Sequence, residues 1–178
     1  MNFAWSFTIM DRGNNKTFLL LGGNLGNVLE TIGDARKMIS ESAGNIIRSS
    51  QVYKSAPWGF ESTDFFLNQV VEVETWLNPE SLLKKLLMIE SALGRQRTLG
   101  KMDSRTIDID ILLFNNLIMK TESLEIPHPR FPLRRFALVP LTEVAREHVH
   151  PGLGKTIGQL LEVCTDTSLV TSISENLS

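Results

Sequence analysis

Hydrophobic and polar residues follow one another along the chain in patterns that predict four strands. A short apolar run closed by two glycines, residues 17–21, predicts a buried strand. Segments 45–53 and 68–76 are rich in β-branched residues and predict two more strands. Residues 104–114 alternate most clearly, with isoleucines at every second position in the centre, and predict the fourth strand.

Two stretches between these strands repeat apolar residues at helical spacing. The first begins near Leu25 and ends before Gly44, a residue type that often follows a last helical turn. The second begins at Asn78, a good capping residue, which is followed by proline and then an acid in the first turn, and Gly94 ends it. Glu90 lies at the edge of the apolar face of this second helix. An acid there either extends to water, which is the more common case, or points toward a ligand.

The order of these elements is strand, helix, strand, strand, helix, strand. This is the β-α-β-β-α-β pattern of an α+β, ferredoxin-like fold. It predicts an antiparallel sheet with both helices on one face, which leaves the other face free to carry a site. A C-terminal extension follows, with a short hairpin or extended excursion over 115–125, a helical or extended run over 136–144 and a helix over 156–163.

Length and composition indicate one globular domain. The 178 residues are enough to bury a core, and 42% hydrophobic and 21% charged residues are ordinary for a globular protein. We expect residues 1–16 to be an N-terminal extension that the core does not need. Residues 17–164 would form the single domain, and 165–178 would be a weakly ordered tail.

Charge and cysteine content narrow the possible functions. With 18 basic and 20 acidic residues the net charge is −2, which gives no general attraction to nucleic acids or membranes. Cys164 is the single cysteine, so an internal disulfide and a Cys-based zinc site are excluded, and a reducing, cytoplasmic setting fits. No apolar run approaches the roughly 20 residues that cross a bilayer, and we expect no signal peptide.

The fourth predicted strand carries the strongest chemical signal. Asp108 and Asp110 lie on the face opposite the isoleucines, about 6–7 Å apart along the strand. Mg²⁺ in proteins is usually held by one or two carboxylates together with substrate phosphates. Taken alone, the pair could equally lie on a solvated face of an antiparallel sheet.

Basic residues gather just before this strand. Arg95, Arg97, Lys101 and Arg105 fall within eleven residues, and the segment 98–104 has no helical or strand period, which predicts a loop. Guanidinium groups form bidentate hydrogen bonds with phosphate oxygens, and carboxylate-bound Mg²⁺ bridges those oxygens. A solvated basic loop is a common alternative, but the combination of arginines and carboxylates favours phosphate handling.

A long loop, residues 54–67, is rich in aromatic side chains. Pro57 and Gly59 interrupt regular structure, and the aromatic content argues against disorder. Two interpretations remain open: a stacking pocket for a flat ligand, or a loop packed over a small satellite core, which composition slightly favours. The aromatic residues are Trp58, Phe60, Phe65 and Phe66.

Six short segments, in order between about residues 17 and 160, form a specific pattern. They are L-G-G-N-L-G at 21–26, F-L-N at 66–68, E-S-A-L-G-R-Q-R at 90–97, S-R-T-I-D-I-D-I-L-L-F at 104–114, I-P-H-P-R at 126–130 and R-R-F-A-L-V-P-L at 134–141. Together they resemble the 6-hydroxymethyl-7,8-dihydropterin pyrophosphokinase family of folate biosynthesis. The R-T-x-D-x-D-I-L element with its upstream G-R-x-R is the most specific part.

The resemblance implies a reaction and a set of site residues. Pyrophosphate would pass from ATP to the hydroxymethyl group of 6-hydroxymethyl-7,8-dihydropterin with release of AMP, in a monomer whose partners are small molecules. Two Mg²⁺ ions would be held by Asp108 and Asp110, which with Arg95, Arg97 and Arg105 make up the implied catalytic group. The implied ATP contacts are Glu90, Arg95, Arg97, Arg105, Ile111, His128 and Arg134. The implied pterin contacts are Ser55, Pro57, Phe66, Asn68 and Phe136, with the pterin stacked between the two phenylalanines.

One departure from the family pattern keeps an alternative open. Met102, Asp103 and Ser104 stand where the family usually has an aromatic residue followed by Gly-Pro. A nucleotide-sensing domain that binds ATP without turnover would fit such a change. A ferredoxin-like RNA-binding module is a further alternative, but the chain has no K/R-G-F/Y-G/A-F run and its pI is about 5.9.

Overall fold

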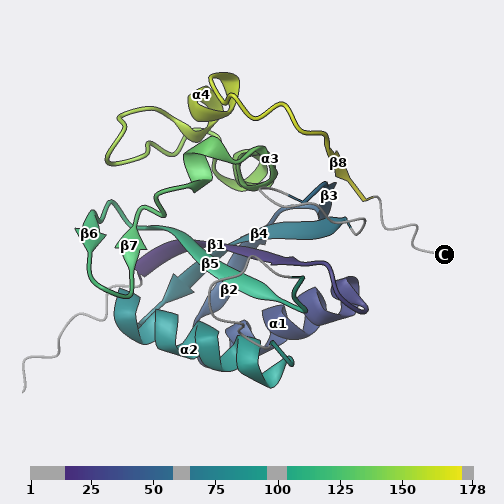
Figure 1. The fold of residues 1–178 in the computed structure, drawn as a ribbon. Coiled ribbons are helices and arrows are strands. Elements are labelled where there is room, and N and C mark those ends of the chain that lie inside the picture. Colours follow the sequence, from purple (N-terminus) through teal and green to yellow (C-terminus); the bar gives the residue numbers. More distant parts are fainter. Residues whose placement is uncertain (1–14, 58–64, 96–103, 174–178) are drawn as a thin grey trace, which may run out of the picture.

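An antiparallel sheet forms the centre of the protein (Figure 1). The computed structural model describes residues 15–57, 65–95 and 104–173. Within these residues the strand order is β5-β1-β4-β3-β8, and β2 also pairs with β4. In chain order the elements are β1 (Asn15–Gly23), α1 (Val28–Ser42), β2 (Asn45–Ser49), β3 (Tyr53–Ser55), β4 (Phe66–Thr75), α2 (Pro79–Ala92), β5 (Asp108–Phe114), β6 (Met119–Lys120), β7 (Glu125–Ile126), a 3-10 turn (Phe131–Leu133), α3 (Arg135–Ala145), α4 (Ile157–Glu162) and β8 (Val170–Ser172).

The predicted ferredoxin-like order of strands and helices is confirmed, with one subdivision. The segment predicted as a single strand over 45–53 forms two short strands, β2 and β3, which pair with β4 one after the other. Ser50 lies between them, and its N–H donates to the Val70 carbonyl at 2.8 Å. The chain therefore turns at Ser50 without leaving β4.

Both helices begin close to their predicted positions. α2 begins after Asn78, whose side chain accepts the Ser81 N–H at 2.8 Å, as the capping signal predicts. α1 begins three residues later than Leu25, because Asn27 caps it by accepting the Glu30 N–H. The side-chain cap, and not the first apolar residue, sets where the helix starts.

The sheet is covered on both faces, which corrects the expectation of one free face. α1 and α2 pack below the sheet and α3 and α4 pack above it (Figure 1). The core under α3 and α4 is built from apolar residues of β1, β4 and β5 as well as the helices. Its fully buried members include Val70, Leu112, Leu113, Phe131, Leu138 and Ile157. The second face carries a core of its own, and any site lies where that core ends.

The predicted alternation of β5 holds only for its first half. Ile109 and Ile111 face α1 and α2, but both Leu112 and Leu113 belong to the core on the opposite face. The cause is a bulge, because Leu19 pairs with Ile111 while the preceding residue of β1 pairs with Leu113. Leu112 is the extra residue, and a bulge of this kind bends a strand locally.

Both ends of the predicted domain differ from expectation. Asn15 and Lys16 belong to β1 and not to an extension, and Lys16 Nζ forms an ion pair with Glu72 Oε1 at 2.8 Å. The segment expected to be a weakly ordered tail contains β8, which pairs with β3. Among the described helices none has the length and apolar character of a membrane span.

Candidate active site

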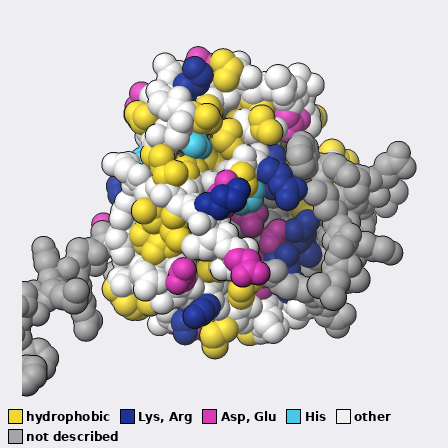
Figure 2. Space-filling model, turned by 60° about the vertical axis from the view of Figure 1, so that its left-hand side comes forward, with side chains coloured by type: hydrophobic (Ala, Val, Ile, Leu, Met, Phe, Trp, Pro, Cys, Tyr) yellow, Lys and Arg dark blue, Asp and Glu magenta, His cyan; other side chains and the backbone are white. Residues whose placement is uncertain are grey.

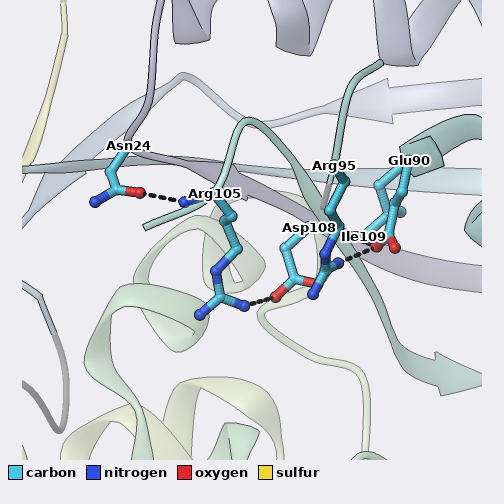
Figure 3. A network of polar contacts seen from close by, with 6 residues as sticks. All are labelled: Asn24, Glu90, Arg95, Arg105, Asp108 and Ile109. Carbon is cyan, nitrogen blue, oxygen red and sulfur yellow. Dashed lines mark hydrogen bonds and ion pairs between the residues drawn. The ribbon is translucent and has the colours of Figure 1, made fainter. Parts of the chain in front are cut away.

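Asp108 is the centre of an ion-pair network at the start of β5 (Figure 3). Its carboxylate pairs with the guanidinium groups of Arg95 and Arg105. Arg95 Nη1 also donates to Glu90 Oε1 at 2.6 Å, and the same oxygen accepts the Ile109 N–H at 2.7 Å. Two of the predicted phosphate-binding arginines therefore meet a predicted metal ligand.

Glu90 does not extend to water, so the more common interpretation of this residue is wrong. It is only 2% exposed and lies between the last turn of α2 and the beginning of β5. A buried carboxylate is stable when charge and hydrogen bonds compensate it, and Arg95 and the Ile109 N–H provide both. Glu90 thereby fixes Arg95 relative to β5.

Gly23, at the end of β1, allows the segment before β5 to pack directly against the β1 backbone. A Cβ atom on Gly23 would come within 2.4 Å of the Thr106 carbonyl oxygen, so a side chain there is excluded. The N–H groups of Asn24 and Leu25 donate to the Arg105 carbonyl at 3.0 and 3.2 Å. Asn24 Oδ1 in turn accepts the Arg105 N–H at 2.8 Å (Figure 3). These contacts hold the backbone of Arg105 in place beside Asp108.

Asp110 lies on the same face as Asp108, two residues further along β5. Burial, and then the neighbouring charge of Asp108, raise the pKa of Asp110 to about 7, while Arg134 acts to lower it. Two carboxylates that destabilise each other in this way are a suitable pair for a divalent cation. No group of three or more His, Cys, Asp or Glu side chains that could hold a metal occurs in the described residues, so substrate oxygens would have to complete the coordination.

His128 and Arg134 approach the aspartates from the segment that precedes α3. The His128 N–H donates to the carbonyl of Leu112, the bulged residue of β5, at 2.9 Å. His128 Nδ1 accepts the Arg130 N–H at 3.1 Å, so in the neutral ring the proton is on Nε2. Burial first, and then the charges of Arg134 and Arg130, lower the pKa of His128 to about 4. At neutral pH His128 is an uncharged hydrogen-bond donor.

Figure 2 shows the same arrangement on the molecular surface. Acidic side chains are gathered beside a histidine, with Lys and Arg side chains around them. Burial lowers the pKa of Arg134, while the charges of Asp110 and Asp108 act to raise it. The site combines negative charge in its centre with positive charge at its rim.

The two predicted stacking residues lie next to two of these arginines. The Phe66 ring centre is 5.8 Å from Arg105 Cζ, and the Phe136 ring centre is 5.6 Å from Arg134 Cζ. Both distances fall within the range of cation–π contacts. The predicted ATP and pterin contacts are therefore adjacent in space.

A buried hydrogen bond joins two more of the predicted pterin contacts. Asn68 Nδ2 donates to Ser55 Oγ at 3.0 Å, and each residue is 2% exposed. Pro57 is half-buried at the end of a described segment. Trp58 lies outside the described residues, as does Phe60, so the role of the aromatic loop remains a prediction. Phe65 is 53% exposed, and Lys54 Nζ lies 3.9 Å from its ring centre.

One residue implied by the family resemblance, Ile111, is not part of this cluster. The Ile111 side chain is 4% exposed and packs in the core under α1 and α2, on the face opposite the aspartates. Arg97 and Met102 lie outside the described residues. Asn24 and Arg130 are site neighbours that the sequence reasoning did not single out, although both fall within segments that carry the family resemblance, 21–26 and 126–130.

Relatives of known name agree with the resemblance. The sequence model of the 7,8-dihydro-6-hydroxymethylpterin-pyrophosphokinase (HPPK) family matches residues 18–146. The 2-amino-4-hydroxy-6-hydroxymethyldihydropteridine pyrophosphokinase of Haemophilus influenzae is 37% identical over 154 residues, which are 86% of this chain and 95% of the relative. The folic acid synthesis protein fol1 of Pneumocystis carinii is 39% identical over 153 residues, which are 86% of this chain. The chain spans 20% of the length of fol1.

Solved structures show the same fold. A crystal structure of Plasmodium falciparum HPPK-DHPS with pteroate superposes with a TM-score of 0.69 at 19% identity, over 84% of this chain and 44% of the other. At that identity the likeness concerns the fold alone. The family match over residues 18–146, together with relatives such as the Haemophilus influenzae enzyme, establishes that this chain belongs to the HPPK family.

Proposed function

We propose that this chain transfers a pyrophosphoryl group from ATP to the hydroxymethyl oxygen of 6-hydroxymethyl-7,8-dihydropterin and releases AMP, as a step of folate biosynthesis. The observation that supports this most is the gathering of Asp108, Asp110, Arg95 and Arg105 at one end of the sheet. Phosphoryl-type transfer depends mainly on positioning and charge stabilisation, and these residues offer both.

The residues present fit Mg²⁺. Asp108 and Asp110 project from the same face of β5, and burial together with the charge of Asp108 raises the pKa of Asp110, so a bound cation would stabilise its charged form. Bound Mg²⁺ would neutralise charge on phosphate oxygens and orient them for displacement. Arg95 and Arg105 pair with Asp108 in this structure. When ATP and the metal bind, Asp108 would bind the metal, and both guanidinium groups would turn to the triphosphate.

The remaining polar residues would hold the triphosphate and the pterin. Arg134 would add a cation, and His128 would donate a hydrogen bond through Nε2 without adding charge. Phe66 and Phe136 would stack on the flat pterin ring. The Ser55 hydrogen bond fixes the Asn68 amide, which would recognise the edge of that ring.

The test is AMP formation from ATP, Mg²⁺ and the hydroxymethyl pterin by the purified chain. Asp108→Asn should lower the rate by at least about 100-fold, the usual cost of removing one electrostatic group from an active site. Asp34→Asn, at an exposed position of α1, is the matched control and should leave the rate unchanged. ATP binding without AMP formation in the wild type would favour the nucleotide-sensing alternative instead.

Metal binding is measured separately from turnover. Calorimetric titration with Mn²⁺ and a non-hydrolysable ATP analogue should give a clear binding signal for the wild type and for Asp34→Asn. The signal should be weakened at least about tenfold in Asp108→Asn, because one of two carboxylate ligands is lost. Equal binding by all three proteins would reject the metal site.

A further inference from the structure

The first turn of α3 lacks a cap from its own N-terminal residue. Arg134 occupies the N-cap position, and its side chain makes no capping hydrogen bond. Asp166, from the segment that follows α4, supplies the missing acceptor, because its Oδ2 accepts the Arg135 N–H at 2.9 Å. The bonded residue lies between Arg134 and Phe136, which are a proposed ATP contact and a proposed pterin contact.

Asp166 is itself held in position. Its second oxygen, Oδ1, accepts the Ser168 N–H at 2.9 Å. Although burial raises the pKa of Asp166, hydrogen bonds from Ser168 and Arg135 lower it below its usual range, so the carboxylate is charged at neutral pH. A negative charge at a helix N-terminus is stabilising, because the N–H groups there carry partial positive charge.

The same segment also reaches β3, which carries Ser55, another proposed pterin contact. Two residues beyond Ser168 it forms β8, in which Val170 pairs with Ser55 of β3. The Ile173 N–H then donates to the Val52 carbonyl at 2.8 Å. Ser55 is the residue that accepts the hydrogen bond of Asn68. Residues 166–173, here called the C-terminal strap, thus connect the start of α3 with β3.

The strap is attached by polar and backbone bonds and not by buried side chains. None of its side chains is buried, and Leu169 is 77% exposed. Loss of the Asp166 contact therefore removes a positional restraint on α3 without opening a hole in either hydrophobic core. A change at this residue should alter the site more than it alters the overall stability.

We propose that Asp166 is a positioning residue of the pterin site, which holds the start of α3 so that Phe136 faces Phe66 across the bound ring. This inference rests on the proposed function, because it assigns the stacking role to Phe136. Of the proposed ATP contacts, only Arg134 is next to the Arg135 N–H; Glu90, Arg95 and Arg105 belong to α2 and to the segments between α2 and β5, which the strap does not contact through any of the bonds described. Asp166 should therefore affect pterin binding more than ATP binding.

The experiment compares two dissociation constants in four proteins: the wild type, Asp166→Ala, Asp166→Asn and Thr167→Ala. The first constant is for an ATP analogue with Mg²⁺, and the second is for the hydroxymethyl pterin in the presence of that analogue. Asp166→Ala should weaken pterin binding about tenfold, the effect of losing one helix cap, and ATP-analogue binding less than about threefold. Asp166→Asn keeps one acceptor oxygen and should fall between. Thr167→Ala changes an exposed neighbour and should match the wild type.

Several outcomes would overturn the assignment. These are unchanged pterin affinity in Asp166→Ala, equal losses for both ligands, or thermal unfolding of both Asp166 variants at the assay temperature. Failure of the proposed function looks different, because the wild type itself would then neither bind the pterin nor release AMP. In that case, amide hydrogen exchange at Arg135 and Phe136 still decides whether Asp166 fixes the start of α3, since exchange should rise at least about tenfold in Asp166→Ala.

Discussion

Two clusters of charged residues lie on the same face of the sheet, and they are built in opposite ways. Around Glu72, one buried carboxylate meets two cations, Lys16 at 2.8 Å and Arg48 at 2.6 Å. Asp108 also pairs with two cations, Arg95 and Arg105, but a second carboxylate, Asp110, lies nearby, and its pKa is raised by burial and by the charge of Asp108. The first cluster is satisfied by the protein itself, whereas the second would be satisfied by a ligand.

The pKa values of the two clusters carry the same distinction. Although burial raises the pKa of Glu72, its hydrogen bonds and charges from Lys16 and Arg48 lower it below its ordinary value. The pKa of Asp110 is raised to about 7. Strongly perturbed acids of the second kind concentrate at functional sites. Substitutions in the two clusters should therefore have opposite effects on stability and activity.

Asp110→Asn should give the largest effect of all, and on activity alone. AMP formation should fall at least about 100-fold, because a ligand of the proposed metal site is lost. The free energy of unfolding should stay the same or rise, since the substitution removes one of two neighbouring like charges. Urea denaturation and the AMP assay together measure this. A substantial loss of stability would mean that Asp110, like Glu72, stabilises the folded protein.

Glu90→Gln should affect both quantities, because Glu90 ties Arg95 to β5. The neutral amide still accepts the Ile109 N–H but no longer balances the guanidinium, so the free energy of unfolding should fall by about 1–3 kcal/mol. ATP-analogue binding should weaken about tenfold as Arg95 loses its orientation. Glu41→Gln, at an exposed position of α1, is the control for both measurements. Wild-type affinity for the ATP analogue in Glu90→Gln would show that the orientation of Arg95 by Glu90 does not contribute to ATP binding.

Glu72→Gln should affect stability alone. The free energy of unfolding should fall by about 1–2 kcal/mol, because both cations lose a charged acceptor. AMP formation should remain within about twofold of the wild-type rate, since the cluster would contact neither substrate. A rate loss larger than the stability loss explains would show that the two clusters are coupled.

The smallest effect should appear in the pH dependence of stability. Because the pKa of Glu72 is lower in the folded chain than its ordinary value, its contribution is present above the ordinary value and is lost as the pH falls through the folded value. The wild type should therefore lose more stability than Glu72→Gln between about pH 5 and pH 3. Parallel curves for the two proteins would contradict the assigned direction of the shift.

The sequence predicted the first layer of the fold well and the second layer poorly. The helices on the α1 and α2 side have an amphipathic period and side-chain caps, which are local signals. The covering of the other face depends on α3, whose contacts with β4 are distant along the chain, and on α4, which packs against α3. The position of this second helical layer on the sheet follows from tertiary packing, which hydrophobic periodicity along the chain does not encode.

The site was predicted in part for the same reason. The residue types and spacing of Asp108, Asp110 and the arginines pointed to phosphate chemistry, and the structure brings Arg95 and Arg105 to Asp108. The buried role of Glu90 was missed, because an acid at the edge of an apolar face gives no sign of the guanidinium that will meet it. Asp166 was missed because it lies 31 residues from the N–H that it accepts.

The bulge at Leu112 lets β5 stay paired with β1 and also accept a hydrogen bond from the segment that carries His128. Ile111 and Leu113 pair with adjacent residues of β1, so a chain shortened by Leu112 could keep every other pair of that ladder in step. Such a deletion would remove the buried Leu112 side chain from the core under α3 and α4, together with the carbonyl that accepts the His128 N–H. The bulge therefore joins the segment that carries His128 to the strand that carries the two aspartates, and shortening β5 by this residue should release that segment from the strand.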